Sequence, residues 1–360
     1  MPSKAPNNGP EPVALSARRP TLKDVARETG YHITTISLAL RGHSSIPADT
    51  RQRIEETAQR IGYQRNPVFH ALSRFRQQGC VRAPAPRIAY LENYGTGTAR
   101  QPHLQVMYQG ALQQAELLGY QLDVLSVGED AHDARSLSHY LRDNHITGVV
   151  LAAFQPGFAE IALNWDDYAI AKIHSRHTEP NATVVANDQL REVRMAYRHL
   201  ASLGYDRIGL AVSRADEDAC GHRHTAGYLM ELASIPPDRQ VPPLIFPYNI
   251  GGVVLGDMIA RWIKRHQVDV VLCNWLSIRE MLERTGLRVP QDVACACLCL
   301  CDPVPDNLAG VRPHLHLVGE RAVSIVVTHL KSGQLGPPEI PSSIYVQSTW
   351  QDGPSAPARR

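Results

Sequence analysis

Residues 21–67 read TLKDVARETGYHITTISLALRGHSSIPADTRQRIEETAQRIGYQRNP. Thr21 opens a capping box, TLKD, which predicts the start of a first helix. A second helix is predicted over about 33–40, and a third over about 48–61, where apolar residues recur at helical spacing. Two short helices joined across Gly30 and braced by a third are the plan of a helix-turn-helix module.

Charge separates this stretch from the rest of the chain. The 360 residues have a formal net charge of only +2. Residues 1–82 hold 13 basic and 6 acidic side chains, a net charge of +7, whereas the remaining residues have a net charge of −5. Neutralising phosphates supplies most non-specific DNA affinity, so the basic N-terminal part is expected to bind a polyanion. The alternative is a small three-helix domain with a solvated charged face.

The same residues resemble the DNA-binding headpiece of the LacI/GalR (lactose-repressor) family. The segments TLKDVA, TTIS, TRQRI and IGYQRNP carry the resemblance. It implies a transcription regulator, usually a repressor, that binds a pseudo-palindromic double-stranded DNA operator as a homodimer with one recognition helix per half-site. It also implies a hinge over about 66–74 that folds on entering the minor groove.

The resemblance also implies which residues contact DNA: the start of the first helix, the recognition helix, and later phosphate or hinge positions. The expected DNA-binding residues are Thr21, Leu22, Lys23, Ile33, Thr34, Thr35, Ser37, Leu38, Arg41, Thr50, Tyr63, Asn66 and Leu72. Leu38 departs from the family, which often has Arg there, and it can make only apolar contacts such as one to a thymine methyl. Arg41, one turn further on, is a candidate to compensate. Leu72 matches the leucine that such hinges wedge between base pairs.

The acidic body alternates apolar runs with amphipathic stretches, which is typical of a parallel α/β architecture. Strands are predicted over 87–91, 121–127, 148–153, 168–173, 207–212, 244–246, 268–273 and 293–298. Helices are predicted over 104–118, 133–144, 188–203, 221–234, 252–266, 276–285 and 318–332. A body of this length suits two sheets better than one.

The resemblance continues into the body, which is similar to the two-lobed, periplasmic-binding-protein-like effector domain of the same family. Landmarks are LASLGYDRIGL, AGYLMEL, VLCNW, TGLRVPQDVA and a closing strand pair, SSIYVQSTW. The expected domains are a disordered leader 1–19, a headpiece 20–65, a hinge helix and linker 66–83, an effector and dimerisation domain 84–352, and a disordered tail 353–360. The implied lobes are about 84–176 with 308–336 (N-lobe), and 177–305 with 337–352 (C-lobe).

The effector is expected between the lobes, where the family reads its ligand with an Arg and an Asp. Those two positions are His224 and Cys299 here, which leaves the chemistry of the effector open, a sugar or related metabolite included. The expected effector-binding residues are His174, Arg223, His224, Asn274, Trp275 and Cys299. The alternative for His224 is a surface or inter-lobe residue that contacts no ligand.

Cys295, Cys297, Cys299 and Cys301 alternate along one predicted strand, and a metal- or redox-gated body is the alternative that they raise. On a strand all four would point to one face, with alternate residues about 6.6 Å apart. Sulfurs around one zinc ion lie closer together, so one extended strand cannot supply a four-cysteine site. Packing of most of these thiols in the core is therefore expected.

Several function classes are not supported. The loop 94–100 lacks the third glycine of a dinucleotide-binding fingerprint, and the chain has no P-loop, HExxH or GxSxG motif. We therefore expect no enzyme, no cofactor and no metal. No apolar run approaches the roughly 18 residues of a membrane span, and residues 1–20 lack the apolar core of a signal peptide. These features and the basic headpiece favour a cytoplasmic regulator over a solute-binding protein.

Overall fold

The computed structural model describes residues 22–40, 46–61, 85–93, 101–128, 133–154, 160–174, 177–247 and 250–359. The chain divides into two compact units, residues 1–83 and 84–360. The expected fold class, a helix-turn-helix headpiece followed by an α/β body with parallel sheets, is confirmed. The expected leader 1–19 and the hinge and linker 66–83 lie outside the described residues.

The first unit contains the three predicted helices: α1 (Leu22–Thr29), α2 (Ile33–Ala39) and α3 (Ala48–Arg60). Gly30 follows α1 with a φ of 72°, a left-handed conformation that suits glycine after a helix. Each helix contributes to one small core, which consists of Val25, Ile36, Ala39, Ile54 and Ala58.

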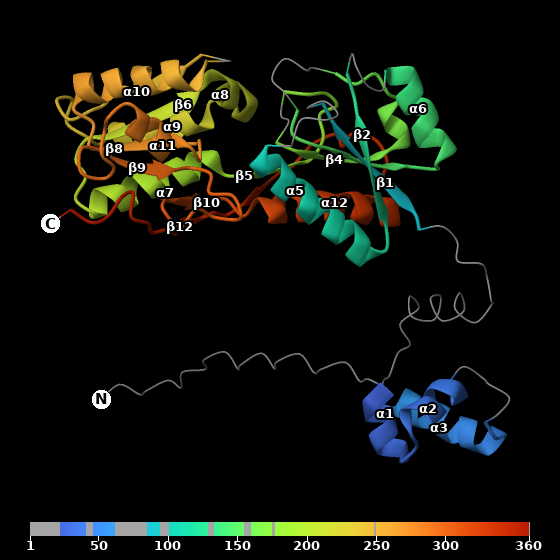
Figure 1. The fold of residues 1–360 in the computed structure, drawn as a ribbon. Coiled ribbons are helices and arrows are strands. Elements are labelled where there is room, and N and C mark those ends of the chain that lie inside the picture. Colours follow the sequence, from blue (N-terminus) through green and yellow to red (C-terminus); the bar gives the residue numbers. More distant parts are fainter. Residues whose placement is uncertain are drawn as a thin grey trace, which may run out of the picture. The chain divides into compact units, whose positions relative to one another are not determined.

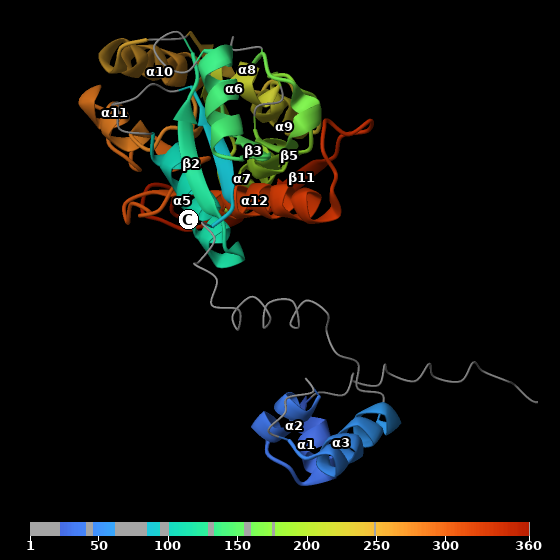
Figure 2. The same cartoon turned by 90° about the vertical axis from the view of Figure 1, so that its right-hand side faces the viewer.

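The N-lobe of the second unit is built on a six-stranded parallel sheet with the order β11-β5-β4-β3-β1-β2. Its strands are β1 (Arg87–Glu92), β2 (Gln121–Ser126), β3 (Gly148–Leu151), β4 (Ala169–Ile173), β5 (Val184–Asn187) and β11 (Ser343–Val346). Helices α5 (Pro102–Leu118) and α12 (Leu315–Ser332) pack together on one face of the sheet, and α6 (Ala134–Asp143) covers the other (Figure 2).

The C-lobe is built on a second six-stranded sheet with the order β12-β10-β9-β8-β6-β7. Its strands are β6 (Ile208–Ser213), β7 (Leu244–Phe246), β8 (Val270–Cys273), β9 (Ala294–Cys297), β10 (Ala309–Arg312) and β12 (Thr349–Gln351), of which only β12 is antiparallel to its neighbour. Its helices are α7 (Gln189–Ser202), α8 (Arg214–Cys220), α9 (Arg223–Leu232), α10 (Gly252–His266) and α11 (Ile278–Arg284). Helices α7 and α9 cover one face and α10 and α11 the other (Figure 1).

The expected lobe boundaries are wrong for three strands. β5 and β11 were assigned to the C-lobe but pair in parallel with each other in the N-lobe sheet, and β10 was assigned to the N-lobe but pairs with β9 in the C-lobe sheet. The closing stretch 342–350 is also not a strand pair, because β11 joins one sheet and β12 the other. The chain therefore passes between the lobes three times, after β5, β10 and β11. Local apolar pattern predicts a strand but not the sheet that it joins.

The expected disordered tail 353–360 is wrong over its described residues. Ser355 is fully buried, its Oγ accepts a hydrogen bond from the backbone N–H of Ala309 at 2.8 Å, and the same hydroxyl donates to the carbonyl of Cys295 at 2.7 Å. Arg359 forms an ion pair with Asp269 at 2.9 Å. These residues cover the ends of β9 and β10.

Within the described ranges, no helix is both long enough and apolar enough to cross a membrane.

Candidate functional site

Eight of the thirteen expected DNA-binding residues lie on α1, α2 and α3. Thr35 and Leu38 on α2 are half-buried, as is Thr50 on α3, whereas Ile36 and Ala39 between them are buried in the three-helix core. Leu22 and Lys23 lie in α1, and Ile33, Thr34 and Ser37 lie in α2. For these five residues the structure describes the backbone but not the side chains. Thr21, Arg41, Tyr63, Asn66 and Leu72 lie outside the described residues. DNA contact by all of these residues remains a prediction.

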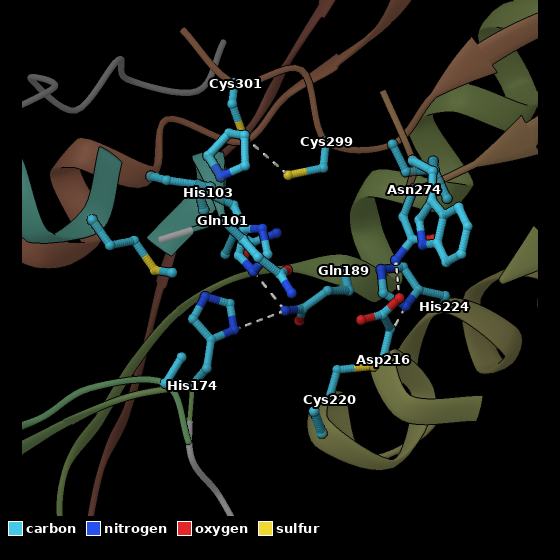
Figure 3. A pocket seen from close by; sticks show the side chains of 18 of the residues that line it. Gln101, His103, His174, Gln189, Asp216, Cys220, His224, Asn274, Cys299 and Cys301 are labelled. Atoms are coloured by element: carbon cyan, nitrogen blue, oxygen red, sulfur yellow. Dashed lines mark hydrogen bonds between the residues drawn. The ribbon is translucent and has the colours of Figure 1, made fainter. Parts of the chain in front are cut away.

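A cavity of about 460 Å³ lies between the lobes of the second unit, within the size range of small-molecule sites. Several residues that line the cavity lie at the carboxyl ends of parallel strands. His174 follows β4 and Asn274 follows β8 (Figure 3), and Asn187 is the last residue of β5. Ligands of open α/β sheets bind at this edge. The lobe crossing after β5 leads directly into α7, whose first residue, Gln189, also lines the cavity.

Two polar side chains that line the cavity each have a buried amide oxygen that accepts no hydrogen bond from the described residues. The amide nitrogen of Asn274 donates to Oδ2 of Asp216 at 2.7 Å, which leaves Oδ1 of Asn274 unpaired. The amide nitrogen of Gln189 lies 3.2 Å from Nδ1 of His174 and 3.3 Å from Oδ1 of Asn187, which leaves Oε1 of Gln189 unpaired. Because a buried acceptor is costly when it lacks a donor, this wall is suited to a ligand that brings donors.

The ionisable residues that line the cavity include the carboxyl groups of Glu192 and Asp216, and the positive charge of His224 is paired with Glu217. Among the cavity's described lining residues none is Lys or Arg. Asp216 accepts hydrogen bonds from Ser213 and Asn274 and contributes a carboxylate. Burial raises the pKa of Glu192 against the opposing effect of hydrogen bonds from Ser348 and Asn187. Burial likewise lowers the pKa of His103 and favours its neutral form.

His224 stands where the family places its ligand-reading Arg, and its ring is paired within the wall. Its Nδ1 lies 2.8 Å from Oε1 of Glu217. Burial favours the neutral ring, but hydrogen bonds to Cys220 and Glu217 outweigh burial and raise the pKa of His224 to about 10. The charge of the imidazolium is therefore neutralised inside the protein.

Of the expected effector-binding residues, five line the cavity: His174, His224, Asn274, Trp275 and Cys299. Arg223 is not among the described residues that line this cavity, and its contact with an effector also remains a prediction. Its guanidinium forms an ion pair with Asp188 at 2.7 Å and lies over the ring of Tyr345. Contact of the other five with an effector remains a prediction.

Sequence reasoning missed Gln189, Asp216 and Glu192, which also line the cavity. Gln189 and Glu192 belong to α7, which was predicted as a helix without its cavity-facing residues, and Asp216 belongs to α8, which the apolar pattern did not predict. A signal for α8 was available in Ser213, whose hydroxyl accepts from the backbone N–H of Asp216 as an N-cap.

The expectation that four cysteines share one face of one strand is wrong. β9 ends at Cys297, so only Cys295 and Cys297 lie on the strand, where both are buried in the C-lobe core. Cys299 and Cys301 lie beyond it and line the cavity, with their sulfurs 3.5 Å apart.

Comparisons with known proteins agree with this architecture. The family model for bacterial regulatory proteins of the lacI family matches residues 21–66. An uncharacterised HTH-type transcriptional regulator of Streptomyces limosus is 24% identical over 347 residues, which cover 89% of this chain and 91% of the relative. The HTH-type transcriptional regulator GntR of Pseudomonas aeruginosa is 26% identical over 321 residues, which cover 84% and 87%.

Two solved structures share the fold. A complex of the transcriptional regulator CelR with cellobiose has a TM-score of 0.56 at 19% identity and covers 94% of this chain and all of that one. A lac repressor dimer bound to operator and an anti-inducer has a TM-score of 0.54 at 16% identity and covers 95% and 100%. Fold and matches together indicate a helix-turn-helix transcription regulator with a two-lobed body. The headpiece matches the lacI family of bacterial regulatory proteins, and the whole chain is similar to regulators of that family.

Proposed function

We propose that the protein is an operator-binding repressor whose DNA affinity is controlled by a neutral, hydroxyl-rich small molecule in the cavity between the lobes. The observation that carries this proposal is the unpaired acceptor pair, Oδ1 of Asn274 and Oε1 of Gln189, in a wall that has no Lys or Arg among its described lining residues. Hydroxyl groups supply the donors that such acceptors need. A phosphorylated or carboxylated ligand would instead bring charge toward Asp216 with no described Arg or Lys to neutralise it.

Departures from the family support a ligand without a negative charge. His224 replaces the Arg that could grip an anion, and its charge is directed to Glu217. Apolar side chains in the same wall, among them Phe154 and Trp275, offer surface to the carbon skeleton of a sugar-like molecule. CelR, a structural neighbour, is described with bound cellobiose, and another LacI-family neighbour with bound ribose.

The headpiece is proposed to bind as a homodimer to two half-sites in the cytoplasm, with α2 as the recognition helix. Helix-turn-helix regulators place this second helix in the major groove, and protein two-fold symmetry matches a pseudo-palindromic operator. The body contributes control because a ligand that contacts both lobes favours one arrangement of the lobes over another. Operator affinity then changes by the free energy with which the ligand distinguishes these arrangements.

The experiment compares neutral sugars with their phosphorylated and carboxylated counterparts in a thermal-shift screen of the full-length protein with a chelator present. We expect stabilisation by a neutral compound, and a change in operator affinity on adding it. Gln189→Met should lower the affinity for that compound about two- to tenfold, which is the range for one lost hydrogen bond. Gln109→Met, an exposed position on α5 outside the cavity, is the matched control. Stabilisation by anionic compounds alone would overturn the proposed effector class.

A further inference from the structure

Three side chains of different chemistry meet at the junction of α8 and α9. Glu217 and Cys220 belong to α8, and His224 to the first turn of α9. The two linking residues, Gly221 and His222, have φ values of 67° and 58°, so the chain reverses within two left-handed residues. This tight reversal brings the three side chains together, and Cys220 and His224 reach the cavity wall (Figure 3).

The ligand atoms of the three side chains all lie within 4.8 Å of one another. Nδ1 of His224 is 2.8 Å from Oε1 of Glu217 and 3.4 Å from Sγ of Cys220, and Sγ of Cys220 is 3.7 Å from Oε1 of Glu217. In a tetrahedral zinc site, bond lengths of about 2.0–2.3 Å place N, O and S donors about 3.3–3.7 Å apart. Two of the three separations already match, and the third needs only a small opening of the His224–Glu217 contact.

The surroundings suit a bound cation. Glu217 is fully buried, Cys220 is 6% exposed and His224 7% exposed. The backbone N–H of Thr225 donates to Oε2 of Glu217 at 3.1 Å, which orients the carboxylate with Oε1 toward His224 and Cys220. A hydrogen bond of this kind to a ligating carboxylate is typical of the outer shell of metal sites.

We propose that Glu217, Cys220 and His224 bind one zinc ion, with a fourth coordination position open to the cavity. The donor set, one thiolate, one imidazole and one carboxylate, is one that zinc accepts, and three protein ligands with an open position leave room for water or an oxygen of a bound molecule. Coordination requires the thiolate and the neutral imidazole, so zinc displaces one proton from each of these side chains.

The other described cysteines of the 295–301 segment do not form a comparable set of metal ligands. Cys299 and Cys301 bring their sulfurs to 3.5 Å but supply only two donors, and Cys295 and Cys297 are buried in the C-lobe core. The triad alone combines three ligand types at metal-binding separations within the described residues. The site goes beyond the proposed effector response, because its occupancy can be measured without DNA or effector.

The test uses full-length protein stripped with a chelator, then titrated with zinc chloride or with cobalt(II) chloride as a spectroscopic probe. We expect one zinc ion per chain by elemental analysis after gel filtration. Cobalt should give a near-ultraviolet thiolate-to-cobalt absorption and the visible bands of tetrahedral coordination. Cys220→Ser should abolish the thiolate absorption and weaken zinc binding at least tenfold. Cys295→Ala, a buried thiol outside the triad, is the matched control and should bind as wild type.

A further measurement does not depend on folding of a variant. Zinc should protect Cys220 of the wild-type protein from alkylation, as read by peptide mass spectrometry, more than it protects Cys273. Three outcomes would overturn the proposal: no zinc retained by the wild type, wild-type zinc affinity in Cys220→Ser, or loss of zinc only when Cys299 and Cys301 are both replaced by Ser.

Discussion

Nδ1 of His224 lies 2.8 Å from Oε1 of Glu217, and both side chains are buried, with His224 also lining the cavity between the lobes. A family position that usually reads a ligand with Arg is thus occupied by a His whose charge is neutralised inside the protein. The ion pair joins α8 to α9 and therefore stabilises the junction between these two helices.

His224→Gln should therefore destabilise the metal-free body. The change leaves the Glu217 carboxylate buried without its cation, and breaking a buried pair in this way costs about 3–5 kcal/mol. Urea unfolding at neutral pH with a chelator measures the loss. His222→Gln, in which the replaced side chain is half-exposed at 56%, is the control and should change stability by less than about 0.5 kcal/mol. A loss below about 1 kcal/mol in His224→Gln would contradict the ion-pair account.

Gly319→Ala should destabilise the N-lobe, because α12 lies against α5 at this glycine. A Cβ on Gly319 would lie 1.9 Å from the carbonyl oxygen of Met107 on α5. Overpacking typically costs about 1–3 kcal/mol, and a rigid backbone neighbour places the expected loss at the upper end or beyond. Gly252→Ala, at an open position on α10, should be neutral or stabilising by up to about 1 kcal/mol. Equal unfolding midpoints for the two variants would reject the close packing.

Ile54→Ala should abolish operator binding while the body remains folded. Ile54 is fully buried in the small core of the headpiece, and such truncations cost about 2–5 kcal/mol. A three-helix unit has little stability to lose. Fluorescence anisotropy with operator DNA measures binding, and the melting curve of the body should be unchanged. Glu55→Ala, the exposed neighbour on α3, is the control. Wild-type operator affinity in Ile54→Ala would show that this core does not support DNA binding.

Leu72→Ala should weaken operator binding far more than binding to random DNA. The resemblance assigns Leu72 to the hinge as a wedge between base pairs, and kinking by an apolar wedge contributes only where the central bases can be deformed. Competition between operator and random duplexes at one salt concentration measures the ratio of affinities. Equal losses on both duplexes would remove the wedge role.

Local signals predicted much of the fold. Capping and apolar spacing located α1, α2 and α3, and each of the eight predicted body strands is present. The elements β5, β10 and α8 were missed, and the last of these (RADEDAC) has no apolar period. Lobe membership could not be predicted either, because it depends on which distant strand supplies the hydrogen-bonding partner.

In the candidate site, too, some residues could be placed from the sequence, whereas contacts that depend on the three-dimensional fold could not. Position matching to the family brought His224, Asn274 and Cys299 to the cavity wall. Arg223, which was also expected at the cleft, lies outside the cavity lining and forms an ion pair with Asp188. The contact between Glu217 and His224 was not predicted, since it depends on the reversal between α8 and α9.

Selection of bound sequences from a random pool of double-stranded DNA by the full-length protein tests the central claim most directly. The account predicts an enriched inverted repeat with two half-sites, bound about 10³-fold or more tightly than a scrambled duplex at the same salt concentration. Selection without an enriched motif, or equal affinity for the scrambled duplex, would contradict sequence-specific operator recognition.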